Sequence, residues 1–146
     1  MKDLLFKTNH DWTGLVLRLT AGIIMLPHGL QKLFGVFGGY GFSATMEYFT
    51  DVMKLPRTIS FLVIIIECFG ALGLIAGFAS KLWAAALIVV MIGAIHTTNF
   101  QHGLFMNWNG TQSGEGFEYH LLYIGICAGI MITGSGRYSV DSLLLQ

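Results

Sequence analysis

The amino-acid sequence predicts an all-α fold, in which four hydrophobic helices cross a membrane as an up-down bundle. Of its 146 residues, 54% are hydrophobic and only 11% are charged, whereas charged residues make up about a quarter of a typical soluble domain. The mean hydropathy is +0.67. Four helices of about 20 residues, the length that a bilayer requires, use more than half of the chain. We therefore predict a single integral membrane domain over residues 1–146, with the lipid bilayer as its first partner.

The predicted spans cover residues 12–33, 58–78, 82–98 and 117–133. Backbone amides in hydrocarbon have no water to bind, so a spanning segment has to be a helix or part of a closed barrel. None of the four segments shows the alternating hydrophobicity of a barrel strand. The sequence therefore predicts four transmembrane helices.

The two long connections differ in character. In the first, Phe42, Met46, Phe49 and Met53 recur at helical spacing before Pro56 ends the pattern, which predicts a short amphipathic helix along the membrane surface or over the bundle mouth. The second connection, residues 99–116, contains Trp108 and several Gly and Asn residues but no Lys or Arg. We interpret this second connection as an ordered or lid-like loop.

Charge indicates an orientation and excludes one class of partner. The formal net charge is zero, so no basic field would recruit nucleic acid. Basic residues are slightly more frequent on the side that holds both termini, with Lys2, Lys7, Lys81 and Arg137, than on the other, with Lys32, Lys54 and Arg57. Because cytoplasmic loops carry the excess of Lys and Arg, we expect both termini in the cytoplasm.

Glu67 is the ionisable residue near the middle of the second span. A charged side chain at the bilayer centre costs about 2.5 to 3.5 kcal/mol on insertion scales, so it is retained only with a partner or a role. By helical rise, Glu67 falls at a depth between Arg18 and His28 of the first span, and either could pair with it. Two interpretations stay open: a structural ion pair, or a proton or ligand site.

A second group of polar residues is predicted at the mouth opposite the termini. His28 and Lys32 share one face of the first helix, at positions i and i+4, and Glu118 and His120 open the fourth span at the same face. We expect these residues to share a cavity covered by the loop around Trp108. The alternative is a hydrogen-bonded histidine beside a lysine that reaches toward the headgroups.

Metal and thiol chemistry have weaker support. His96, His102, Glu118 and His120 fall at one face and could ligate a metal, but their spacing matches no compact motif, so we assign none. Cys68 and Cys127 lie inside apolar runs without a C-x-x-C pair. Buried, inert thiols are the favoured interpretation.

Several segments in order along the chain resemble the DoxX family of bacterial and archaeal four-helix membrane proteins. They are LPHGLQKLFG at residues 26–35, the stretch from Glu67 to Gly77, GFEY at residues 116–119 and GSGRYSVD at residues 134–141. The resemblance implies a bacterial inner-membrane protein of a redox or quinone-linked system. Related families that support thiol chemistry use a cysteine pair, which this sequence lacks.

On this basis, His28, Lys32, Glu67 and His120 are expected to line a polar cavity for a quinone, with Arg18 and Glu118 as further candidates. His28 and Lys32 could donate to the quinone carbonyls, and Glu67 could relay a proton. The sequence has no c-haem motif, dinucleotide fingerprint or iron–sulfur cysteine set, so a partner protein would have to carry electrons. Whether the chain is itself an enzyme is left open.

Two other classes of function compete with this interpretation. In a non-enzymatic assembly or binding module, the polar residues would hold the bundle together and the loops would dock another protein. In a small transporter, for example a homo-oligomer, the intramembrane charges would mark a pathway. Bound quinone in purified protein would favour the redox interpretation.

Overall fold

A computed structural model of the chain describes residues 6–9 and 11–144, in which every regular element is a helix. Lys2, which entered the orientation argument, lies outside these residues. The first span is one helix, α2 (Trp12–Phe34), and the last is α7 (Glu118–Thr133). These findings confirm the predicted all-α class.

The second and third spans are continuous helices that change winding along their length. The second consists of α4 (Arg57–Ile65), a wide π-helical turn η2 (Ile66–Gly70) and α5 (Ala71–Ala76). The third consists of α6 (Ser80–Ala94), a π-helical turn η3 (Ile95–Asn99) and a short 3-10 turn η4 (Phe100–His102). Among the described residues, the first three spans are long and apolar enough to cross a membrane, and α7 is an apolar helix of 16 residues.

Local sequence explains where the first helix begins and ends. The side chain of Asp11 accepts a hydrogen bond from Gly14 N at 3.0 Å, which satisfies one free amide at the start of α2. Gly35 ends the helix with φ of 73°, a left-handed conformation that glycine adopts without a steric penalty. The predicted amphipathic helix is also present, as α3 (Gly41–Glu47) and the π-helical turn η1 (Tyr48–Val52).

Two glycines let α2 approach the second span closely. A Cβ atom on Gly29 would lie 2.5 Å from the Cα of Cys68, and one on Gly22 would lie 2.9 Å from the carbonyl oxygen of Ala71. Both distances are too short for any side chain at these positions. The backbones of α2 and the second span are therefore in direct contact, which fixes the register between them.

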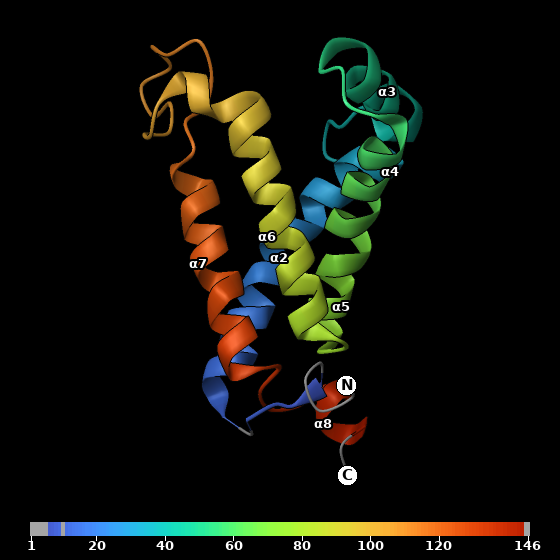
Figure 1. Cartoon of the computed structure of the whole chain (residues 1–146), viewed down its shortest axis with the longest axis vertical. Helices are drawn as coiled ribbons and strands as arrows, with labels where there is room; N and C mark the ends of the chain where they lie inside the picture. Colours follow the sequence, from blue (N-terminus) through green and yellow to red (C-terminus); the bar gives the residue numbers. More distant parts are fainter. Residues whose placement is uncertain (1–5, 10, 145–146) are drawn as a thin grey trace.

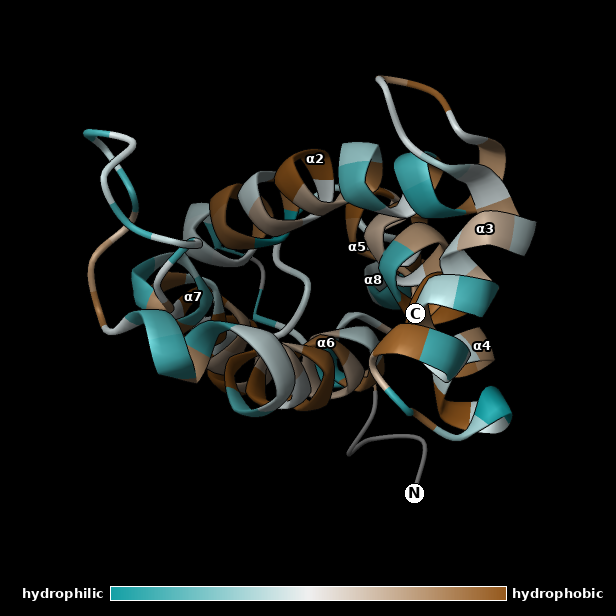
Figure 2. Ribbon diagram, turned by 90° about the horizontal axis from the view of Figure 1, so that it is seen from above, coloured by the Kyte–Doolittle hydropathy of each residue, from teal (hydrophilic) through white to brown (hydrophobic). Residues whose placement is uncertain are grey.

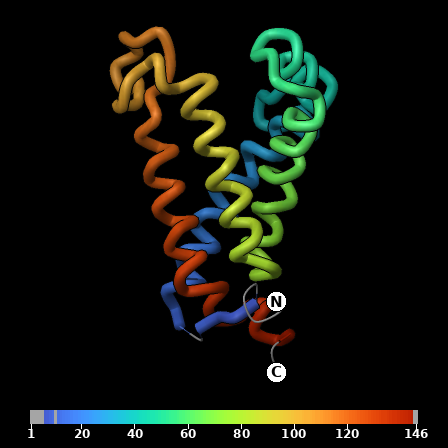
Figure 3. Tube along the Cα trace, viewed as in Figure 1, coloured from blue at the N-terminus to red at the C-terminus, as the bar shows by residue number. Residues whose placement is uncertain are grey.

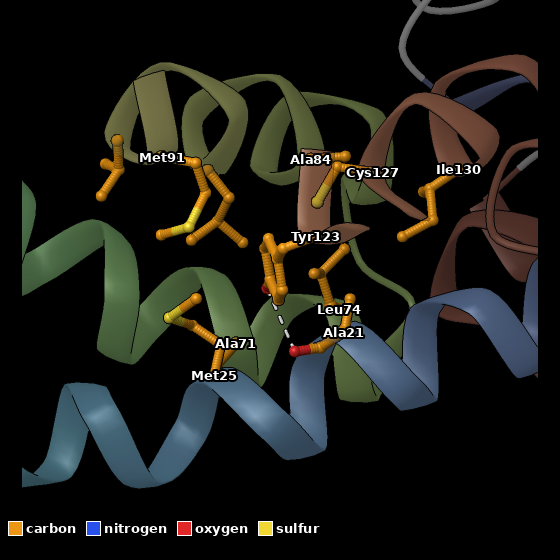
Figure 4. Packing of buried hydrophobic residues seen from close by; sticks show 11 residues of the cluster. Ala21, Met25, Ala71, Leu74, Ala84, Met91, Tyr123, Cys127 and Ile130 are labelled. Atoms are coloured by element: carbon orange, nitrogen blue, oxygen red, sulfur yellow. Dashed lines mark hydrogen bonds between the residues drawn. The ribbon is translucent and has the colours of Figure 1, made fainter. Parts of the chain in front are cut away.

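The buried core lies where all four spans meet. Ala21, Leu74, Leu87 and Ile130 are fully buried there. Figure 4 shows Tyr123 of α7 crossing this core, where its hydroxyl donates a hydrogen bond to the carbonyl of Ala21 at 3.1 Å. The core thus ties α7 to α2 by a polar contact as well as by packing.

Figure 1 shows that the bundle is V-shaped. α2 begins and α7 ends at one end, which we name the terminal end (Figure 3). α6 contacts the second span at η2 and α5, whereas α4 diverges from α6 toward the opposite end, which we name the mouth end. Seen from above, the loop after η4 and the α3 segment lie on opposite sides of this mouth (Figure 2).

Candidate functional site: a cavity with a polar end

A cavity of about 490 Å³ lies between the second and third spans, toward the mouth end. Its walls are mostly apolar, with Leu62, Val63, Val89 and Met91 among the lining side chains. Lys32 and Glu67 also line it, with His28 of α2 and His120 of α7. Ligand sites in proteins commonly combine this range of volume with a few convergent polar groups.

Glu67 is paired with Lys32. The Nζ atom of Lys32 lies 2.5 Å from Oε2 of Glu67, and the two side chains are 26% and 6% exposed, respectively. The expectation that Glu67 pairs with Arg18 or His28 is therefore wrong. The four-carbon stem of Lys32 lets its ammonium reach back from the end of α2 to the buried carboxylate.

The position of Glu67 depends on two features of the backbone. Glu67 sits on the π-helical turn η2, where the wider winding changes the direction in which side chains project. The contact of Gly29 with Cys68 then holds α2 against this turn. Lys32, three residues after Gly29 on α2, is thereby brought within reach of Glu67.

Two aromatic rings of α7, those of Tyr119 and His120, lie near the polar end of the cavity, and that of His120 lines it. The ring of Tyr119 lies 6.2 Å from that of His28 and 5.6 Å from that of His120, measured between centroids. The hydroxyl of Tyr119 and Nδ1 of His120 are buried and have no hydrogen-bond partner among the described residues. Of these two residues only His120 lines the cavity, and because buried polar groups in proteins are nearly always paired, its orphaned nitrogen indicates a site for a ligand or water.

Tyr119 was not among the residues predicted from the sequence. The available signal was its position between Glu118 and His120, at the start of an apolar span. Tyrosines at such positions are usual at membrane interfaces, so composition alone does not distinguish a site residue from an interfacial anchor.

Glu118 does not line the cavity. Its Oε2 accepts a hydrogen bond from the backbone N of Met106 at 3.3 Å and so holds the loop that precedes α7. His102 is likewise engaged outside the cavity, where its ring nitrogens lie 3.2 Å from the Ser113 hydroxyl and 3.3 Å from the Gln101 side-chain amide. These residues shape the loop and do not contribute to the cavity walls.

The expectation that the loop around Trp108 covers the cavity is also wrong. Trp108 is 82% exposed, and no residue of its loop lines the cavity. The cavity is instead lined toward the mouth by Tyr48, Phe49, Met53 and Leu55, from the connection between the first two spans. The physical reason is that the Trp108 loop joins α6 to α7, on the opposite side of the mouth from α4 (Figure 1).

No group of three or more His, Cys, Asp or Glu side chains is placed to hold a metal ion within residues 6–9 and 11–144. Cys68 and Cys127 are free thiols, 2% and 0% exposed. The polar groups of the residues that line the cavity are the ammonium of Lys32, the carboxylate of Glu67, two imidazoles, the phenol of Tyr48 and the hydroxyls of Thr97 and Thr98. These groups can donate and accept hydrogen bonds and move protons.

Arg18 belongs to a separate polar cluster at the terminal end. It is 1% exposed, and its guanidinium donates hydrogen bonds only to backbone carbonyls among the described residues. The acceptors are Ser135 for Nε at 2.8 Å, Leu74 and Ile75 for Nη1 at 3.1 and 2.5 Å, and Arg137 and Tyr138 for Nη2 at 3.1 and 2.7 Å. All five N–H groups of the guanidinium are thus used.

Asp141 completes this cluster from the chain after α7. Its Oδ1 accepts from Ala79 N at 2.6 Å, and its Oδ2 accepts from Ser80 N at 3.1 Å and from the Ser135 hydroxyl. The backbone N of Asp141 donates to the carbonyl of Gly77 at 2.9 Å. A carboxylate at the start of α6 satisfies free amides and interacts favourably with the helix dipole.

We name Arg18, Ser135 and Asp141, with their partners, the terminal clamp. It binds carbonyls near the end of α5 through Arg18 and amides at the start of α6 through Asp141. The GSGRYSVD segment at residues 134–141 supplies most of it. This segment contributed to the family resemblance, but no sequence pattern predicted that Asp141 would cap a distant helix.

The fold and the cavity together define an integral membrane protein, built as a helical bundle with a ligand-sized cavity at the depth of its spans. The chain belongs to the DoxX family, whose model matches residues 14–100. It is 27% identical over 132 residues to the Bacillus subtilis (strain 168) protein named "Putative oxidoreductase CatD", across 90% of this chain and 87% of that protein. No solved structure matches the chain.

Proposed function

We propose that the protein binds a quinone in this cavity and serves as a membrane component of a redox system in the bacterial inner membrane. The observation that carries the proposal is an apolar cavity of about 490 Å³ with Lys32, Glu67, His28 and His120 gathered in its lining. Support also comes from the DoxX family and from the name of the similar Bacillus subtilis protein, which describes an oxidoreductase.

The residues present fit a quinone. A quinone ring needs an apolar slot and a hydrogen-bond donor near each of its carbonyls. Lys32 carries three N–H groups, of which Glu67 accepts one, and the ring of His120, whose Nδ1 has no partner among the described residues, lines the same cavity. The polar end can therefore bind a carbonyl without breaking an existing hydrogen bond.

A bound quinone would supply two-electron, two-proton redox chemistry. In this proposal Lys32 and His120 orient the ring, and Val63 and Met91 exclude water from its apolar face. The pair of Glu67 with Lys32 holds an exchangeable proton at the polar end, 2.5 Å between the two heavy atoms. Electrons come from a partner protein, since the sequence has no motif for a haem, iron–sulfur or dinucleotide carrier.

The proposal is tested on purified protein in lipid nanodiscs. Organic extraction followed by chromatography should recover a quinone from membranes that contain it. Quenching of tryptophan fluorescence by a short-chain ubiquinone then measures affinity, which we expect to fall about tenfold in Lys32→Met through loss of one charge-assisted hydrogen bond. Glu118→Gln is the matched control and should bind as the wild type does, because Glu118 does not line the cavity.

A specific observation also favours a second function, that of an assembly module. Lys32 and Glu67 already neutralise each other, as a structural ion pair between two helices would. Absence of extractable quinone, together with no quenching by the short-chain probe, would favour this alternative. The orphaned groups of Tyr119 and His120 weigh against it, because a structural network tends to be satisfied.

The proposed orientation places both termini in the cytoplasm, following the bias of Lys and Arg near the span ends. Fusions of alkaline phosphatase and of green fluorescent protein after Gln146 test it. Fluorescence without phosphatase activity is the expected result, and the reverse pattern would turn the cavity mouth toward the cytoplasm.

A further inference from the structure

We infer that the cavity receives its ligand sideways from the bilayer, through a portal between α4 and α6, and therefore takes an amphiphile with a flexible apolar tail. The inference rests on the proposed function for the identity of the head group. It adds the route by which the ligand enters the cavity, and the chemistry of the tail that extends from the cavity into the lipid.

The portal is marked by side chains that line the cavity and are also open to the surroundings of the chain. Ile59 and Leu62 of the second span are 47% and 43% exposed, and Val89 of the third span is 69% exposed. All three line the cavity. This exposure places them at an edge of the cavity between α4 and α6, two helices that diverge toward the mouth end in Figure 1.

This opening lies at the depth of hydrocarbon. Leu62 is the sixth residue of the 20-residue span Arg57–Ala76, and Val89 is the tenth residue of the 23-residue span Ser80–His102. Its named edges, Ile59, Leu62 and Val89, are aliphatic. A water-soluble ligand would have to cross lipid to reach it, whereas a lipid-dissolved ligand meets it by lateral diffusion.

The approach from the membrane surface is partly covered: Tyr48 on this side lines the cavity and is 47% exposed, but its neighbours in the lining are less open. Phe49 is 9% exposed and lines the cavity on this side, together with Tyr48, Met53 and Leu55. These side chains come from η1 and the residues that follow it, so a ligand from water would have to pass this amphipathic segment. The polar groups are thus partly covered from the surface side, whereas the apolar wall is open to lipid, an arrangement that suits a polar head inside and an apolar tail outside.

Gly93 provides the space that a tail needs beside α6. It lines the cavity, and a Cβ atom built on it meets no atom within 4 Å. Gly125 of α7 likewise has nothing within 4 Å, but it does not line the cavity. Because glycine is a poorer helix former than leucine, replacing either residue should not impair folding, and the two positions form a matched pair.

The first experiment compares two probes in nanodiscs: 2,3-dimethoxy-5-methyl-1,4-benzoquinone, which has no tail, and the same ring with a decyl tail. In Gly93→Leu the new side chain occupies the tail path, so affinity for the tailed probe should fall about tenfold, as expected for overpacking, while the tailless probe binds as before. Gly125→Leu should change neither affinity. Unchanged binding of the tailed probe by Gly93→Leu, or an equal loss for both probes, would overturn the portal.

A second measurement tests the portal without any quinone. A bimane fluorophore attached to Gly93→Cys should be quenched by lipids with brominated acyl chains and not by aqueous iodide, whereas bimane on Trp108→Cys should be quenched by iodide. Iodide quenching at position 93 would overturn the portal whatever the protein binds. If neither probe binds the wild type while brominated lipid quenches at position 93, the quinone function fails and the portal stands.

Discussion

The terminal clamp and the cavity each bring a basic side chain and a buried carboxylate into the same membrane protein, yet they differ in how completely their groups are paired. In the clamp, Arg18 uses all five of its N–H groups on carbonyl oxygens, and Asp141 accepts from two backbone amides and a hydroxyl. In the cavity, Lys32 has one carboxylate partner, and the groups of Tyr119 and His120 nearby have none among the described residues.

The degree of pairing therefore separates a structural role from a binding role, where charge and burial alone do not. A saturated network in a low dielectric rigidifies the fold and leaves nothing for a ligand to bind. An unsaturated one costs stability unless a ligand or water completes it. Arg18 is the most buried basic residue within residues 6–9 and 11–144, at 1% exposed, and for this reason it is a poor ligand-binding candidate.

The largest expected effect breaks the clamp. Arg18→Met leaves five carbonyls without their donor and Asp141 without a nearby positive charge, and should lower the free energy of unfolding by about 3 to 5 kcal/mol. Thermal unfolding in detergent measures this loss. Arg137→Met is the control, since Arg137 is exposed and its guanidinium lies 5.1 Å from the Trp12 ring centroid. Equal losses in the two variants would contradict the structural importance of Arg18.

Breaking the pair of Lys32 with Glu67 should lower the free energy of unfolding by less than breaking the clamp does, but it should lower quinone affinity. Lys32→Met leaves Glu67 without its partner, and we expect a loss of about 1 to 3 kcal/mol together with the weaker quinone affinity given above. The double variant with Glu67→Leu should recover part of the stability, because the unpaired carboxylate is gone. It should recover none of the affinity, because the ammonium of Lys32 is still missing. If the double variant regains quinone binding, Lys32 and Glu67 are not part of the site.

A smaller effect is expected from the cap at the start of α6. Asp141→Ala removes the acceptor of the Ala79 and Ser80 amides and should lower the free energy of unfolding by about 1 to 2 kcal/mol. Quinone affinity should not change, since the terminal clamp lies at the other end of the bundle. Asp51→Ala serves as the comparison, because Asp51 is exposed. A loss of affinity in Asp141→Ala would show that the two regions are coupled.

The smallest effect is expected in the loop after η4. Trp108→Ala removes a side chain that is 82% exposed, so the free energy of unfolding should stay within about 0.5 kcal/mol of the wild type. Affinity for the short-chain ubiquinone should also be unchanged. Weaker binding would mean that this loop covers the cavity after all.

The sequence predicted the features that the bilayer imposes. Apolar segments had to be helices, and a carboxylate in mid-span had to be buried, as Glu67 is at 5% exposed. The sequence could not identify the partner of Glu67. The choice of partner depends on the rotation of α2 about its axis, which the contact between Gly29 and Cys68 sets. Nor could it place Asp141, whose role arises only when the segment after α7 folds back on the start of α6.

The residues of the candidate cavity were predicted better than the segment that covers it. His28, Lys32, Glu67 and His120 line one cavity, because helix ends at one face of an up-down bundle are level. The choice of covering segment was wrong, since lateral position does not follow from depth. Loop length and composition singled out Trp108, while the residues that do line the mouth side, such as Phe49, resembled an ordinary amphipathic helix.

The shortness of α7 has a consequence for the membrane around it. Its 16 residues reach about 24 Å at 1.5 Å per residue, whereas the hydrocarbon core of a bilayer is about 30 Å thick. The bilayer beside α7 must therefore become thinner, or the exposed apolar side chains that precede α7, such as Leu104 and Phe105, must insert into the hydrocarbon below the headgroups. The protein should accordingly favour thin bilayers, and its partition between lipids of different acyl length should follow α7 and not the three longer spans.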